Sequence, residues 1–185
     1  MVARYVRAGE APLATIGDDL VIRPVRDSDE DALWPILRKV IRAGETYAID
    51  PGLTRERALD LWVRQPRGCY VAEWDGEVIG TYYIKSNQAG GGAHVCNCGY
   101  MTAQAARGRG VARAMCLHSQ SEARKLGYSA MQFNLVVATN VAAIGLWTSL
   151  GFATVGRLPR AFAHPKAGFV DALVMYKWLD EGETA

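Results

Sequence analysis

A glycine-rich segment between a strand-like run and a helix-like run constrains this chain more than any other feature. It spans 106–113 and contains Gly108 and Gly110. Glycines allow the backbone to approach a ligand closely, and the first N–H groups of a helix have no partner within that helix. With the helix dipole, these N–H groups predict a pyrophosphate site. Arg109 and Arg113 can add positive charge near the phosphates.

Two other phosphate-binding motifs do not match this segment. A Walker loop ends in Gly-Lys followed by Ser or Thr, whereas Gly110 is followed here by Val111 and Ala112. A dinucleotide fingerprint needs a third small residue where Arg113 stands, and it belongs near the start of a βαβ fold. A glycine-rich turn without any ligand is the alternative for this segment taken alone.

Length and composition indicate one globular domain. The chain has 185 residues, of which 50% are hydrophobic and 22% are charged, and its net charge is +2. No apolar run reaches the roughly 18 residues of a membrane span, and no secretory signal is recognisable. The arginines are dispersed along the chain rather than clustered, so nucleic acid is not an expected partner. We expect a cytoplasmic protein that does not bind membranes.

The four cysteines do not form a metal-binding pattern. Cys96 and Cys98 are two residues apart, and no paired C-x-x-C knuckles exist. We expect reduced thiols that pack as small hydrophobic residues, and no metal site.

Local patterns predict eleven elements in the order β-α-α-β-β-β-α-β-α-β-β. Ser28 is a candidate cap for the first helix, in which Pro35 either introduces a kink or shifts the start. Thr54 caps the second helix. Asp75-Gly76 predicts a hairpin turn, and Gly127 predicts the end of the helix that follows the glycine-rich segment. The last two strands are expected at 152–157 and 169–178, joined by a loop that contains Pro159, His164 and Gly168.

Two motifs in this order resemble those of the GNAT superfamily of N-acetyltransferases. Arg107-x-x-Gly110-x-Ala112 resembles the R/Q-x-x-G-x-G/A signature of the family. About 30 residues later, the segment from Asn140 through Ala143, Leu146 and Trp147 to Gly151-Phe152 is similar to its N-x-x-A-x-x-L-Y-x-x-x-G-F pattern. The motifs of this chain match those of the superfamily between about residues 101 and 152. The expected order of helices and strands matches from about residue 20 to residue 178.

The resemblance implies an α/β (α+β) fold with a single GNAT-like domain. This fold has a mixed, mostly antiparallel sheet of six or seven strands, helices on both faces, and central strands that splay apart. The domain is expected at 20–179, with an N-terminal extension at 1–19 and a C-terminal tail at 180–185.

The resemblance also implies acetyl-CoA as cosubstrate, with its pantetheine arm paired to the fourth strand. The backbone N–H of Met101 or Thr102 would then polarise the thioester carbonyl, and Asn140 would cap its helix and bind the pantetheine chain. The residues expected to contact acetyl-CoA are Met101, Thr102, Arg107, Gly108, Arg109, Gly110, Val111, Ala112, Arg113, Asn140, Ala143 and Trp147.

Direct attack of a neutral amine on the thioester is the implied chemistry. Trp147 stands where many family members carry a tyrosine that protonates the leaving thiolate, so that role is either unfilled or moved. Asn134 is a catalytic candidate, although an asparagine in an apolar strand needs partners in any case. Glu45 is the candidate general base, with a solvated loop residue as the alternative. His94 and His164 are weaker candidates.

The acceptor is expected to be a small amine. Tyr47, Tyr82 and Tyr100 are candidates to line its pocket, and Arg42 or Arg55 is a candidate to bind an acceptor carboxylate. Short strings such as 133–137 resemble a subgroup that acetylates proline analogues, including azetidine-2-carboxylate. A protein acceptor and a non-catalytic acetyl-CoA sensor are the alternatives. By analogy, the last strands would form a homodimer.

Overall fold

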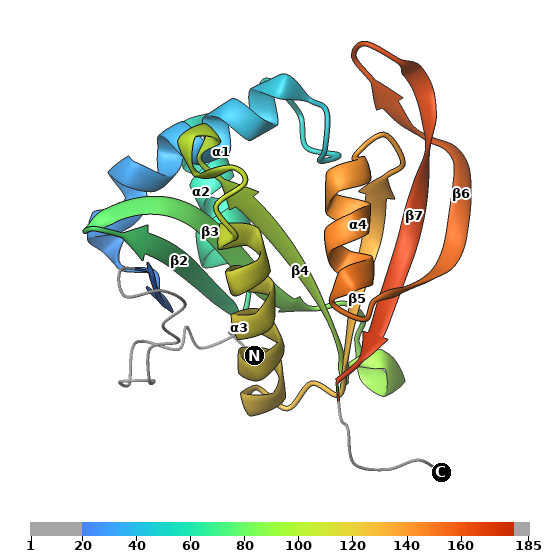
Figure 1. Ribbon diagram of the computed structural model, residues 1–185. Helices are drawn as coiled ribbons and strands as arrows, with labels where there is room; N and C mark the ends of the chain where they lie inside the picture. Colours follow the sequence, from blue (N-terminus) through green and yellow to red (C-terminus); the bar gives the residue numbers. More distant parts are fainter. Residues whose placement is uncertain (1–19, 180–185) are drawn as a thin grey trace.

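The computed structural model describes residues 20–179, and Figure 1 shows a central sheet with helices on both sides. Within these residues seven strands form one sheet in the order β1-β2-β3-β4-β5-β7-β6. The strands are β1 (Leu20–Pro24), β2 (Gly68–Trp74), β3 (Glu77–Ser86), β4 (Val95–Thr102), β5 (Ala130–Val137), β6 (Ala153–His164) and β7 (Gly168–Trp178). The β4–β5 pair is parallel and the other neighbours are antiparallel, as the predicted fold class requires.

The helices divide between the two faces of the sheet. They are α1 (Glu30–Ala43), α2 (Arg55–Leu59), α3 (Val111–Lys125) and α4 (Val141–Ser149). Helices α1 and α2 share one hydrophobic core with the sheet, whereas α3 and α4 share the other. The predicted order of elements is therefore confirmed within 20–179, and the predicted extension and tail lie outside the described residues.

Several local predictions are confirmed by backbone geometry. Asp75 and Gly76 both have positive φ, 50° and 79°, as a tight hairpin turn requires. Gly127 follows α3 with φ of 83°. Thr54 and Asn140 accept hydrogen bonds from the N–H groups of the third residues of their helices, and so act as N-caps.

The start of α1 differs from the prediction. A 3-10 turn at Asp27–Asp29 precedes the helix, and the carboxylate of Asp29, rather than Ser28, accepts the N–H of Arg26 at 2.7 Å. Pro35 lies inside α1, which nevertheless begins at Glu30.

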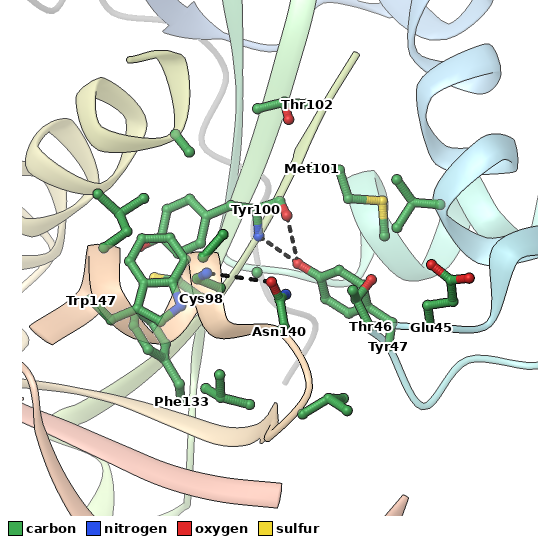
Figure 2. Close-up of a pocket in the computed structure, with 18 of the residues that line it drawn as sticks. Glu45, Thr46, Tyr47, Cys98, Tyr100, Met101, Thr102, Phe133, Asn140 and Trp147 are labelled. Atoms are coloured by element: carbon green, nitrogen blue, oxygen red, sulfur yellow. Dashed lines mark hydrogen bonds between the residues drawn. The ribbon is translucent and has the colours of Figure 1, made fainter. Parts of the chain in front are cut away.

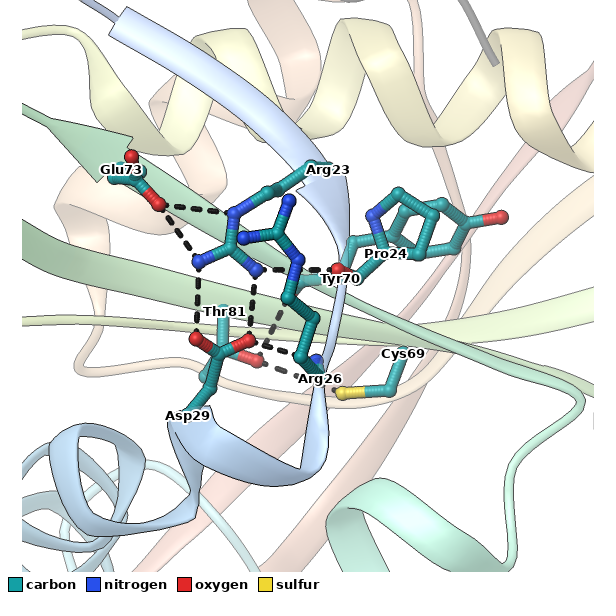
Figure 3. A network of polar contacts seen from close by, with 8 residues as sticks. All are labelled: Arg23, Pro24, Arg26, Asp29, Cys69, Tyr70, Glu73 and Thr81. Carbon is teal, nitrogen blue, oxygen red and sulfur yellow. Dashed lines mark hydrogen bonds and ion pairs between the residues drawn. The ribbon is translucent and has the colours of Figure 1, made fainter. Parts of the chain in front are cut away.

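Arg23 ties this turn to the sheet (Figure 3). Its guanidinium donates to both carboxylate oxygens of Asp29, at 2.7 and 2.9 Å, and also to Glu73 on β2. Burial alone would raise the pKa of Asp29, but the bonds from Arg23 and the Arg26 N–H lower it below its ordinary value. The network therefore fixes where α1 leaves the sheet.

Two predicted boundaries move. The second helix is α-helical only to Leu59, and a π-helical turn continues it over Asp60–Arg64. Strand β6 runs through Pro159, which was expected in a loop, as far as His164. An edge strand tolerates proline because its outer N–H groups need no partner. The register shifts between Leu158 and Phe162 accommodate this irregular stretch.

A row of tyrosines joins the sheet to α3. Tyr70, Tyr82 and Tyr100 lie side by side on β2, β3 and β4. Their hydroxyls reach polar side chains on the buried face of α3. In the same order, the partners are Glu122 (3.0 Å), His118 (2.6 Å) and Ser119 (2.7 Å). Hydrogen bonds in a buried environment are costly to leave unmade, so these contacts hold α3 in one orientation.

The cysteines pack in the core as reduced thiols. The four cysteines are free and buried, and a cytoplasmic location stays a prediction. Among residues 20–179 no helix is long and apolar enough to cross a membrane. The same residues contain no cluster of three or more histidine, cysteine or acidic side chains placed to hold a metal ion.

Candidate functional site

Strands β4 and β5 form the floor of the site by separating from each other. They pair only at Val95–Ala130 and Cys96–Met131. At the next position the side chain of Asn97 donates to the Gln132 carbonyl at 2.9 Å. Beyond Asn97 the two strands diverge, and the edge of β4 that faces β5 has no strand beside it.

Hydrogen bonds show which peptide groups of β4 face this gap. The hydroxyl of Tyr47 accepts the N–H of Tyr100 and donates to its carbonyl, both at 2.7 Å (Figure 2). The Ala103 N–H instead donates to the carbonyl of Ile79, near the start of β3. Successive N–H groups along a strand point to opposite edges, so the N–H of Thr102 faces the gap and the N–H of Met101 faces β3. The gap-facing N–H groups are therefore those of Tyr100 and Thr102.

A cavity of about 820 Å³ opens above the gap. It brings together most of the predicted site residues from segments far apart in sequence. These are Glu45, Tyr47, Tyr100, Met101, Thr102, Arg107, Gly108, Gly110, Val111, Ala112, Arg113, Asn134, Asn140, Ala143 and Trp147.

The glycine-rich segment has the geometry that phosphate binding requires. Gly108 and Gly110 have φ of 76° and 80°, and α3 begins directly after them. The first turn of α3 carries no acidic residue, so its partial positive charge is not offset there. Arg107 and Arg113 line the cavity, whereas the guanidinium of Arg109 lies 4.0 Å from the centre of the Trp74 ring and does not.

Trp147 forms an aromatic wall of the cavity. Its ring centre lies 5.0 Å from that of Tyr100 and 5.1 Å from that of Phe133. The side chain is 8% exposed, so packing holds it in place. Indole has a single N–H donor and no practical acidity, which makes Trp147 a steric boundary rather than an acid.

Asn134 lies on β5 at the open side of the cavity. Its side-chain oxygen accepts from Gln132 at 2.8 Å, and its side-chain nitrogen donates to Asn87 at 2.7 Å. The residue is solvent-exposed, so these contacts are not needed to compensate for burial. Its amide is thereby held in one orientation beside the gap.

Glu45 lies at the mouth of the cavity, in an ion pair with Lys166. The carboxylate and ammonium are 2.6 Å apart. The contact joins the segment between α1 and α2 (residues 44–54, the α1–α2 segment) to the turn between β6 and β7 (residues 165–167, the β6–β7 turn). The hydrogen bond and the charge of Lys166 lower the pKa of Glu45. His164 also lines the cavity.

Other candidates lie elsewhere. Tyr82, expected in the acceptor pocket, is fully buried in the core, where it hydrogen bonds to His118. His94 contacts the Gly91 carbonyl and does not line the cavity. Arg42 contacts the Pro51 carbonyl and Arg55 contacts Asp31, also outside the cavity lining.

Sequence reasoning missed three contributors to the site. The polar Asn97 in an otherwise apolar strand was a usable signal for the strand separation. Lys166 lies in a turn without a motif. The contact between Tyr47 and the Tyr100 peptide joins residues 53 positions apart, and no local pattern indicates it.

Comparison with known proteins agrees with this geometry. The sequence matches the model of the acetyltransferase (GNAT) family over residues 34–152. It is 30% identical over 153 residues to the N-acetyltransferase aca1 of Schizosaccharomyces pombe, and the match covers 72% of each chain.

Solved structures share the fold. A GCN5-related N-acetyltransferase from Kribbella flavida has a TM-score of 0.83 and 44% identity, covering 87% of this chain and 98% of that one. A GNAT superfamily phosphinothricin acetyltransferase from Sinorhizobium meliloti, in complex with acetyl-CoA, has a TM-score of 0.77 and 21% identity. That match covers 89% of this chain and 90% of the other.

Replacing Gly110 with aspartate tests the phosphate site. We expect Gly110→Asp to weaken acetyl-CoA binding by about 100-fold or more, because a carboxylate would stand where the pyrophosphate is expected to bind. Isothermal titration calorimetry measures the dissociation constant.

Gly90→Asp is the matched control. Gly90 also has positive φ (58°) and open space around it, but it does not line the cavity. Gly90→Asp should bind acetyl-CoA as the unmodified protein does. Equal affinity of Gly110→Asp and Gly90→Asp would mean that the phosphates bind elsewhere.

Proposed function

Because the chain belongs to the acetyltransferase (GNAT) family, we propose that it transfers the acetyl group of acetyl-CoA to the amine of a small molecule. N-acetyltransferase activity and acetyl-CoA as cosubstrate follow from the family. The class of acceptor does not follow from the family, and it is what we propose here. An amino acid or an amino-acid analogue, proline analogues included, is the acceptor that we would test first.

The Glu45–Lys166 ion pair supports a small acceptor. It connects the α1–α2 segment with the β6–β7 turn at the mouth of the cavity. A peptide chain needs an open groove with room on both sides of the reacting amine, and this contact narrows the approach. An acceptor that fits beneath the contact reaches the gap without breaking it.

We assign the cosubstrate contacts to the segments that line the cavity. The amides from Gly108 to Arg113 hold the pyrophosphate, with Arg107 and Arg113 as counter-charges. The gap-facing edge of β4 pairs with the pantetheine arm, where the N–H of Tyr100 or Thr102 polarises the thioester carbonyl. Asn140 and Ala143 border the arm.

The acceptor side of the cavity supplies the remaining roles. Asn134 orients the incoming amine, since its amide is already fixed beside the gap. Glu45 stays ionised and relays the ammonium proton to water, and because Lys166 lowers the pKa of Glu45 the carboxylate holds that proton only transiently. The neutral amine attacks the acetyl carbon, the carbon–sulfur bond breaks, and coenzyme A leaves as the thiol with the proton that the amine loses.

A panel of acceptors tests the proposed function. Free-thiol release from acetyl-CoA should occur with one class of small amines among amino acids, proline analogues, polyamines and antibiotics. Peptides with free N-termini or lysines form the comparison group. Turnover on peptides alone would contradict the small acceptor and favour a protein substrate.

Asn134→Ala tests the orienting role. We expect kcat to fall by about 10-fold or more, while the acetyl-CoA dissociation constant stays near normal, because the amide acts on the acceptor side. Asn87→Ala removes one of the two partners that fix the Asn134 amide but leaves the cavity lining intact, so its kcat should fall less than that of Asn134→Ala. An unchanged kcat in Asn134→Ala would remove the residue from the mechanism.

We also propose a homodimer formed through β6, which ends the sheet. Val155 on β6 is 60% exposed and Phe169 on β7 is 66% exposed, so both apolar side chains are available to a partner. Sedimentation velocity at micromolar concentration should give twice the monomer mass of 20.2 kDa. Val155→Lys should shift the protein to monomer, and a monomeric unmodified protein would disprove the assembly.

A further inference from the structure

Tyr47 occupies the position on β4 that the cosubstrate needs. Its hydroxyl lies 2.7 Å from both the nitrogen and the oxygen of the Tyr100 peptide. These groups face the gap and would otherwise be free to pair with an added strand. Figure 2 shows the Tyr47 side chain reaching this peptide from the α1–α2 segment, opposite the side on which Trp147 lies.

We propose that the Tyr47 hydroxyl competes with acetyl-CoA for the Tyr100 peptide, so that cosubstrate binding displaces it. The inference rests on the proposed function only in taking the β4 edge as the place where the pantetheine arm pairs. A peptide N–H has one hydrogen to donate, and the hydroxyl and the thioester carbonyl cannot both accept it at full strength. Tyr47 is therefore a residue of the cosubstrate site as well as of the acceptor side.

The surroundings of Tyr47 favour a small tilt of the ring, which carries the hydroxyl away from the peptide, rather than removal of the side chain from the cavity. Its ring packs edge-on against buried Trp62, with 5.5 Å between the ring centres. Burial raises the pKa of Tyr47, so the phenol keeps its proton and can both donate and accept. A small rotation would release the Tyr100 peptide and leave the hydroxyl next to the bound acetyl group.

Displacement of Tyr47 links the two substrates. Tyr47 lies two residues after Glu45, which is bound to Lys166 across the mouth of the cavity. The α1–α2 segment is thus attached both to β4 and to the β6–β7 turn. Binding of acetyl-CoA then detaches the segment from β4, while the Glu45–Lys166 contact still attaches it to the β6–β7 turn.

Tyr47→Phe tests the competition directly by calorimetry. Removing the hydroxyl abolishes the competing hydrogen bonds while the ring remains, so acetyl-CoA should bind about 2- to 10-fold more tightly. Adenosine 3′-phosphate 5′-diphosphate carries the phosphates but no pantetheine arm. It should bind Tyr47→Phe and the unmodified protein equally.

Tyr128→Phe is the matched control. Tyr128 is also buried and its hydroxyl forms a 2.8 Å hydrogen bond with Ser86, but it does not line the cavity. Its acetyl-CoA affinity should stay within twofold of the unmodified value.

Three outcomes would overturn the inference. They are an acetyl-CoA affinity of Tyr47→Phe that is unchanged or weaker, an equal gain in Tyr128→Phe, and an equal gain for the fragment without the arm. None of these outcomes bears on the acceptor class, which the thiol-release panel decides separately. Tight binding without turnover on any small amine would contradict the proposed acceptor and leave the role of Tyr47 intact.

Discussion

The separation of β4 from β5 is the constraint on which the rest of the site depends. Two residue pairs join these central strands, and the amide of Asn97 then bonds to the Gln132 carbonyl that a backbone N–H would otherwise serve. A buried carbonyl left without a partner would cost about 1–3 kcal/mol, so this side chain allows the ladder to end inside the protein. The cavity, the exposed strand edge and the access to α3 all follow from this interruption.

The segment above the gap is positioned from both ends. At one end, Arg23 holds Asp29 and thereby the direction in which α1 leaves the sheet. At the other, Thr54 caps α2. Between the two helices, Glu45 and Tyr47 contact opposite sides of the cavity. Ile49 and Leu53 pack this segment against the core, and the two polar contacts fix its position over the cavity.

Features encoded within a short stretch were predictable from the sequence, whereas contacts between distant segments were not. The turn at Gly108 and Gly110, the cap at Asn140 and the order of the strands depend on neighbouring residues, and the structure agrees with them. Arg109 turns to Trp74 and Tyr82 turns into the core because of tertiary neighbours that no local pattern reveals. The same holds for Lys166 and for the bond of Tyr47 to Tyr100.

The tyrosine row under α3 has a consequence for the length of ligand that the site accepts. Each hydroxyl pairs with a different polar side chain of α3, so a turn of this helix by one residue would leave several buried polar groups unmatched. The row thus fixes the rotation and the axial position of α3 relative to β4. The distance from the N-terminus of α3 to the gap-facing edge of β4 is therefore fixed by the fold. In the proposed mode of binding, a phosphorylated ligand is then selected by the length of the arm between its phosphates and its reactive end.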